Sequence, residues 1–147
     1  MIEENQRRDW IGLLARAPAT RVKALWDELG VAPEFSWLRR PEIGGVMVRG
    51  RMGGTGAPFN LGEMTVTRCS VRLSCGTAGH GYVQGRDQRK AEIAALCDAL
   101  LQTQGAAQVH QGILTPLTHE MARARQDRAE KAAATKVDFF TLVRGED

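Results

Sequence analysis

A glycine-rich turn, Gly53-Gly54-Thr55-Gly56, joins two segments whose apolar side chains alternate in the manner of β-strands. If residues of the two strands pair so that their numbers have an even sum, these apolar side chains all lie on one face of the hairpin. A shift of one residue would place polar side chains among them. The apolar face then carries Val46, Val48, Met52, Met64 and Val66, and the polar face carries Arg49, Arg51 and Glu63. The sequence therefore predicts an antiparallel hairpin in this register, with Arg49 opposite Glu63 as a cross-strand ion pair.

The apolar pattern changes phase after Val66, at the end of the predicted hairpin. Beyond it, apolar Cys69, Val71 and Leu73 alternate with Arg68, Ser70 and Arg72. A β-bulge would explain the change, and so would a different layer covering the strand; the pattern does not choose between them. A turn over Ser74–Gly79 and a short third strand over Gly81–Gly85 complete the predicted sheet.

Two short amphipathic helices are predicted in residues 1–30. Apolar residues recur at helical spacing in two stripes, which are Trp10, Leu13, Leu14 and Ala17, then Val22, Leu25, Trp26 and Leu29. Pro18 separates the helices, Thr20 can cap the second, and Gly30 ends it. We expect a helical hairpin here, followed by an irregular segment, Val31–Pro41, that contains two prolines.

The C-terminal half predicts two more helices and an apolar tail. Asp87 caps a helix over residues 87–104, and Thr115 with Pro116 begins one over residues 116–134. Beyond Leu117 and Met121 the apolar face of that last helix is mostly alanine, so it gains little from packing on its own core. The tail, residues 137–147, either folds back over the domain, which is the commoner outcome, or reaches another subunit. In the second case Phe139, Phe140 and Leu142 form the interface.

These elements predict one α+β domain over residues 1–147, because a chain of 147 residues normally builds a single core. Its parts are a helical hairpin (1–30), a small antiparallel, meander-like sheet (42–85), the helices 87–104 and 116–134, and the tail 137–147.

The cations are mostly arginine, since only four of the 20 Lys and Arg residues are lysine. Arginine binds anions and carboxylates with a planar, two-pronged group, which favours a binding surface. Arg51, Arg68 and Arg72 have no acidic neighbour along their strands, and Arg86 and Arg89 lie near the start of the helix over residues 87–104, where they could add to an anion site. A turn containing Gly53, Gly54 and Gly56 is either a flexible loop or a place where phosphate or a partner approaches the backbone.

No catalytic or metal-binding residues are predicted. The glycines lie between strands and lack the Walker and dinucleotide patterns. His80, a loop residue in this interpretation, His110 and His119 lie in separate segments, and Cys69, Cys75 and Cys97 have no ligand spacing, so they are expected to be small apolar residues. With neither a leader-like start nor a long apolar run, the chain is expected in the cytoplasm, away from membranes.

Several short blocks, in order along the chain, carry a family resemblance. They are Arg51–Gly56 (RMGGTG), Thr65–Arg68 (TVTR), Val71–Leu73 (VRL), Gly85–Asp87 (GRD), Ala91–Glu92, Asp98–Gln102 (DALLQ), Val137–Thr141 (VDFFT) and Val143–Gly145 (VRG), with Trp10 and Leu14–Ala15 before them. In these blocks the chain resembles the PhnG family, a subunit of the bacterial carbon–phosphorus lyase core complex.

The resemblance implies an accessory subunit of a multi-subunit enzyme that lets bacteria use phosphonates. Its partners would be PhnH, PhnI and PhnJ-like chains and the ATP-binding PhnL. With PhnI, PhnH and PhnL it would support displacement of adenine from ATP by methylphosphonate, giving ribose 1-methylphosphonate 5-triphosphate. It implies no cofactor on this chain: ATP is a substrate of the complex, and the iron–sulfur cluster and S-adenosylmethionine belong to PhnJ.

Two other classes of function fit the arginines. One is an RNA-binding module, which the low aromatic content of 5% argues against because single-stranded RNA is bound by stacking. The other is a stand-alone phosphate-binding domain or phosphate-transfer enzyme, which would consume ATP without partners.

Overall fold

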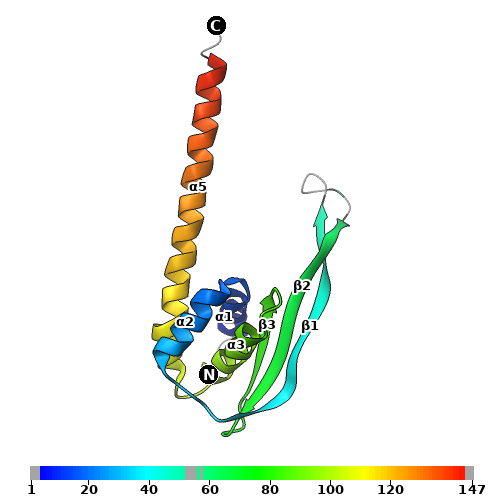
Figure 1. Cartoon of the computed structure of the whole chain (residues 1–147), viewed down its shortest axis with the longest axis vertical. Coiled ribbons are helices and arrows are strands. Elements are labelled where there is room, and N and C mark those ends of the chain that lie inside the picture. Colours follow the sequence, from blue (N-terminus) through cyan, green and yellow to red (C-terminus); the bar gives the residue numbers. More distant parts are fainter. Residues whose placement is uncertain (1–3, 52–55, 57, 145–147) are drawn as a thin grey trace.

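The computed structural model of the chain describes residues 4–51, 56 and 58–144, and for residues 51, 58–61 and 137–144 it describes the backbone alone. Helices α1 (Glu4–Arg16) and α2 (Ala19–Leu29) come first, followed by strands β1 (Phe35–Arg51), β2 (Pro58–Leu73) and β3 (Ala78–Gln84). The chain ends with α3 (Gln88–Leu100), α4 (Ala106–Val109), the π-helical turn η2 (His110–Leu114) and α5 (Thr115–Arg144). The predicted α+β class is confirmed: helices lie on one side of an antiparallel sheet (Figure 1).

The sheet is a meander in the order β1-β2-β3, as predicted. Val46 pairs with Met64 and Val48 with Gly62, which confirms the even-sum register as far as Val48; Met52 lies outside the described residues. The predicted ion pair of Arg49 with Glu63 is wrong, because Glu63 lies opposite Met47. A register shift after Val48 then places Arg49 opposite Asn60.

The change of phase after Val66 comes from the covering layer. β2 pairs with β3 without a register shift from Val66 to Arg72, so β2 contains no bulge there. Beside the helices, Cys69, Val71 and Leu73 are buried against the core. The far half of the β1–β2 hairpin extends past the helical layer (Figure 1). Met47 is exposed there, and so is Met64, which shares with Arg68 the sheet face away from the helices.

Strand β1 begins earlier than the sequence predicts. Residues 35–41 were expected to be irregular, but they pair with β2 through two register shifts, between Trp37 and Arg39 and between Arg39 and Glu42. Pro41 lies in this interrupted stretch. A proline cannot donate a ladder hydrogen bond, and an edge strand with bulges is where sheets tolerate it.

Helices α1, α2, α3 and η2 enclose the core together with the inner face of the sheet. Gly30 ends α2 in a left-handed conformation, at φ 69°, as predicted. Thr20 is not a cap, because it lies inside α2 and the residue before the helix is Pro18. Asp87 does cap α3, accepting a hydrogen bond from the Lys90 N–H at 2.9 Å.

The last helix begins at Thr115, as Thr115 and Pro116 predict, and α4 and η2 lead directly into it from Ala106. The wider turn of η2 ends one residue before Pro116 and accommodates a residue that has no N–H for the previous turn. The predicted end at residue 134 is wrong: α5 continues to Arg144, so residues 137–144 extend it away from the domain instead of folding back (Figure 1).

Within the described ranges no helix combines the length and apolar character that crossing a bilayer requires.

Candidate functional site

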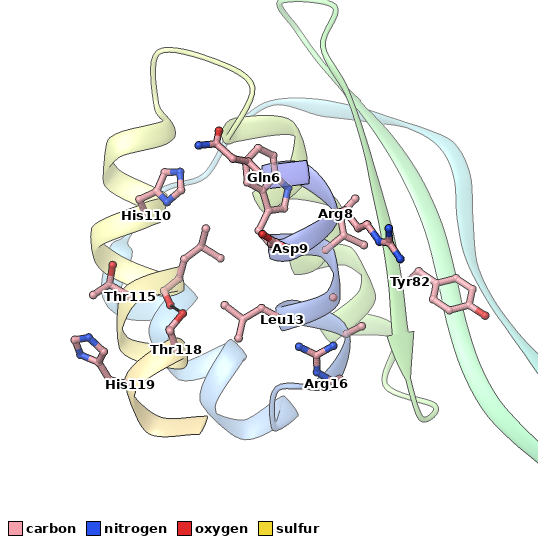
Figure 2. Close-up of a pocket in the computed structure, with 15 residues that line it drawn as sticks. Gln6, Arg8, Asp9, Leu13, Arg16, Tyr82, His110, Thr115, Thr118 and His119 are labelled. Carbon is pink, nitrogen blue, oxygen red and sulfur yellow. Dashed lines mark hydrogen bonds between the residues drawn. The ribbon is translucent and has the colours of Figure 1, made fainter. Parts of the chain in front are cut away.

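A groove of about 830 Å³ runs between α1 and the helical segment formed by η2 and the start of α5 (Figure 2). On the α1 side, Gln6, Asp9, Leu13 and Arg16 face it. On the other side lie His110, Leu114, Thr115, Thr118 and His119. Arg8 and Tyr82 of β3 add to the lining beyond α1. Of the site residues predicted from the sequence, none whose side chain the structure describes lies in this groove.

The groove has an apolar interior and a basic margin. Leu13 and Leu114 supply apolar surface, and the Trp10 ring meets His110 edge-on with ring centroids 6.1 Å apart. The charged lining residues are Arg8 and Arg16 against the single carboxylate of Asp9. Such a surface suits a group that combines apolar and acidic parts.

Buried polar contacts with α3 fix the N-terminal half of α1, which forms one wall of the groove. Asp98 of α3 is completely buried and accepts hydrogen bonds from Arg7 Nε at 3.0 Å and Arg7 Nη2 at 2.9 Å. It also accepts from Trp10 Nε1 at 2.8 Å and from the His80 N–H at 2.8 Å. The hydrogen bond to Asp98 raises the pKa of the Arg7 guanidinium, which therefore keeps its positive charge.

A second contact fixes the C-terminal end of α1. Lys90 is 4% exposed, and its Nζ donates to the Ala15 carbonyl at 3.0 Å. A cation at the end of a helix satisfies a free carbonyl and complements the helix dipole. Burial lowers the pKa of Lys90, and the nearby charge of Asp87 opposes that effect. With both ends tied to α3, the α1 wall of the groove is rigidly placed.

The predicted arginines lie elsewhere and do not converge. Arg68 and Arg72 project from the sheet face opposite the helices, on either side of Ser70, whose Oγ lies 2.7 Å from His80 Nδ1. Arg68 was predicted to have no acidic neighbour along its own strand, but across the sheet Glu42 of β1 lies 3.8 Å away. Both side chains are more than half exposed, so this pair adds little stability. His80, predicted in a loop, belongs to β3.

The other predicted site residues fall at three further places. Arg86 is exposed just before α3, and its neighbour Arg89 pairs with Glu92 at 3.0 Å. At the hairpin tip, Arg51 ends β1 and Gly56 forms a bend, while Gly53, Gly54 and the Arg51 side chain lie outside the described residues. The backbone of Phe139, Phe140 and Leu142 is helical, and their side chains lie outside the described residues as well.

The cysteines are free thiols in different surroundings. Cys69 and Cys97 are buried, as expected for small apolar residues, and burial raises both of their pKa values. Cys75 is exposed, which the sequence did not predict, and hydrogen bonding with Thr77 lowers its pKa. Among residues 4–51, 56 and 58–144, no three His, Cys, Asp or Glu side chains gather in an arrangement that would hold a metal ion.

Two comparisons with known proteins agree on the relationship of this chain. The family described as "Phosphonate metabolism protein PhnG" matches residues 5–145. The chain belongs to the PhnG family. A relative from Rhizobium meliloti (strain 1021) is 49% identical over 147 residues, covering 97% of this chain and 91% of the relative. That relative is named "Alpha-D-ribose 1-methylphosphonate 5-triphosphate synthase subunit PhnG".

Several blocks that carry the PhnG resemblance have structural roles in this fold. Asp98 organises the buried network, and Gln102 Nε2 donates to the carbonyls of Ala78 and Asp98, each at 3.0 Å. The Thr67 hydroxyl donates to the Gly85 carbonyl at 2.8 Å. These blocks therefore specify how the sheet and α3 pack, and the groove follows from that packing.

Helix α5 of this PhnG-family chain does not pack on the core along most of its length, as a helix of a self-contained domain would. Leu117 is fully buried and Met121 is partly buried, and Glu120 pairs with Arg21 at 2.6 Å. Every residue from 122 to 136 is exposed. Most of a helix in a small domain normally packs on its core, so this stretch is a large surface available to another molecule.

Proposed function

We propose that the chain is the PhnG subunit of an α-D-ribose 1-methylphosphonate 5-triphosphate synthase and acts within the bacterial carbon–phosphorus lyase system. The observation that carries the proposal is the 49% identity, over nearly the full length of both chains, with a relative that bears this name. Identity at that level over nearly the full length of both chains supports a shared fold and a shared role.

The reaction is a displacement at the ribose of ATP. An oxygen of methylphosphonate bonds to the anomeric carbon, the bond from that carbon to adenine breaks, and adenine leaves with a proton. The triphosphate remains on the 5-position. In this proposal PhnI-like and PhnJ-like chains supply the reacting groups in the cytoplasm, PhnH-like and PhnL-like chains are further partners, and this chain carries neither catalytic residues nor a cofactor. A PhnJ-like partner cleaves the carbon–phosphorus bond later with its iron–sulfur cluster and S-adenosylmethionine.

The shape of the chain supports a role in assembly. The exposed stretch of α5 and the far half of the hairpin both extend from the helical layer (Figure 1). Ile43, Met47 and Met64 of that hairpin are exposed apolar side chains, at 46%, 56% and 37%. Such surface is stabilised when a partner covers it.

Reconstitution tests the proposal. Purified partner chains, ATP and methylphosphonate are combined with and without this chain, and adenine and the ribose triphosphate product are quantified. We expect product only in the complete mixture and no ATP consumption by this chain alone. ATP consumption by the isolated chain would instead support a stand-alone enzyme, and salt-dependent RNA retention would support an RNA-binding module.

Three variants test the surfaces inferred from the sequence. They are Arg51→Ala, Gly54→Val and a deletion after Lys136, each mixed with the partner chains. Loss of assembly or turnover in any of them assigns that surface to the complex. Assembly and turnover like the parent in all three would show that the hairpin tip and the end of α5 are not contacts.

A further inference from the structure

The face of α5 that lines the groove beside α1 continues along the exposed part of the same helix. Thr115 and Thr118 line the groove, and α5 is one uninterrupted helix from Thr115 to Arg144. Residues on one face of a helix recur every three or four positions. The face of α5 that carries Thr115 and Thr118 therefore also carries Ala122, Ala129 and Ala133. All three alanines are exposed. From Thr115 to Ala133 this face is about 27 Å long, at 1.5 Å per residue.

The alanine-rich stretch is helical without help from the core. Residues 122–136 contain six alanines, and alanine has the highest helix propensity. Gln126 Nε2 also donates to Glu130 Oε1 at 3.1 Å, a pair four residues apart that stabilises isolated helices. A helix formed in this way presents a preformed surface, so a partner loses little free energy in ordering it.

The charge on this surface indicates the chemistry of its partner. Residues 122–136 hold five Lys or Arg against two Asp or Glu, and Arg125 borders the alanine face. Arg8 and Arg16 flank the groove itself. A second copy of the chain would place like charges together, whereas acidic side chains on another protein would be attracted.

We propose that the groove and the Ala122–Ala129–Ala133 face form one docking track for an acidic, amphipathic α-helix of a partner chain. Apolar side chains of that helix fill the groove over Leu13 and Leu114, and its acidic side chains meet Arg8, Arg16 and Arg125. The alanines allow the two helix axes to approach closely. This is a helix-in-groove contact, and it rests on the proposed function because the partner belongs to the same synthase.

A matched pair of substitutions tests the track. Ala129→Glu places a larger, acidic side chain on the docking face, and Ala124→Glu makes the same change about 140° away around the helix. Both positions are exposed on α5, and glutamate is a good helix former, so both variants keep the fold. We expect Ala129→Glu to weaken binding to the partner chains of the synthase at least about tenfold and Ala124→Glu less than about twofold.

Crosslinking identifies the occupant. A photoreactive phenylalanine analogue at Thr118 or Ala129 is activated in the assembled complex, and crosslinked peptides are mapped. We expect both positions to mark one helical, acidic segment of one partner chain. Crosslinks to a second copy of this chain, to nucleic acid, to ATP alone, or to no partner in an assembled complex would each overturn the inference.

The outcomes separate this inference from the proposed function. If the parent chain does not bind the partner chains at all, the proposed function fails. If the parent binds and Ala129→Glu binds equally well, the chain remains a subunit and only the docking track is wrong. Arg125→Gln adds an independent readout: it should reduce the salt dependence of binding, because it removes one of the attracting charges.

Discussion

The carboxylate of Asp98 accepts a hydrogen bond from the backbone N–H of His80 at 2.8 Å, which ties α3 to the outer edge of the sheet. β3 is an edge strand, and its free N–H groups would otherwise be open to pairing with another chain. Arg7 and Trp10 bring α1 to the same carboxylate. One buried carboxylate therefore binds an N–H group of the sheet edge and positions a wall of the groove.

Replacing Asp98 with asparagine should destabilise the domain by about 3 kcal/mol. The amide keeps one oxygen but turns an NH2 group toward donors from Arg7, Trp10 and His80, and it leaves the arginine without its counterion. Urea denaturation measures the loss. Asp127→Asn, on the exposed part of α5, serves as the control and should change stability by less than about 0.5 kcal/mol.

Gly81→Ala should also destabilise the domain, by about 1–3 kcal/mol. A Cβ at Gly81 would lie 2.2 Å from the Ala91 carbonyl oxygen, so β3 and α3 would have to separate. Gly44 also lies in a strand, but a Cβ there meets nothing within 4 Å. Gly44→Ala is therefore the matched control, and equal denaturation midpoints for the two variants would contradict the close approach of β3 and α3.

Features set by neighbouring residues were predictable from the sequence. The alternation of apolar and polar side chains on both sides of the glycine turn determines the hairpin register around Val46 and Met64. The N-cap at Asp87 and the end of α2 at Gly30 depend on local backbone chemistry. Family membership was also predictable, since the resembling blocks span the chain and the comparisons confirm them.

Features set by distant contacts were not predictable. Asp98 would be read as a surface residue of α3, yet it is buried because Arg7 and Trp10 reach it from the other end of the sequence. The groove is likewise assembled from α1, β3 and the η2–α5 segment, which only the tertiary structure brings together. The length of α5 was underestimated because the apolar cluster that begins at Val137 was interpreted as a separate tail, whereas the helix continues through it to Arg144.

The stability contributed by Asp87 should depend on pH. Burial alone would raise its pKa, but hydrogen bonds from the Lys23 side chain and the Lys90 N–H lower it below the ordinary 3.8. The ionised group therefore stabilises the fold fully above that value, and the effect is lost as the pH falls through the lowered pKa. Asp87→Ala should cost about 1 kcal/mol near neutral pH, and the difference from the parent should shrink below about pH 4. Asp87→Asn keeps an N-cap acceptor and should lose less.

The three thiols should react at different rates with an aromatic disulfide reagent. Cys75 is exposed and has a lowered pKa, whereas burial raises the pKa of Cys69 to about 11 and also raises that of Cys97. Because the thiolate reacts, the native chain should show one fast thiol, and Cys75→Ser should remove that phase. In denaturant all three should react. A second fast thiol in the native parent would show that β2 or α3 opens more readily than the packing implies.

Removing the exposed part of α5 should weaken binding to the partner chains and leave the stability of the domain nearly unchanged. A chain that ends after Ala122 keeps Leu117 and Met121, and it loses the exposed residues 123–136 together with the helical end beyond them. Its free energy of unfolding should therefore stay within about 0.5 kcal/mol of the parent, because the described side chains that it lacks are all exposed. Binding to the partner chains should fall more strongly than with Ala129→Glu, because the alanine face and its basic border are both removed. A truncated chain that unfolds at much lower denaturant concentration would show that α5 supports the domain itself, in which case its exposure could no longer be taken as a sign of docking.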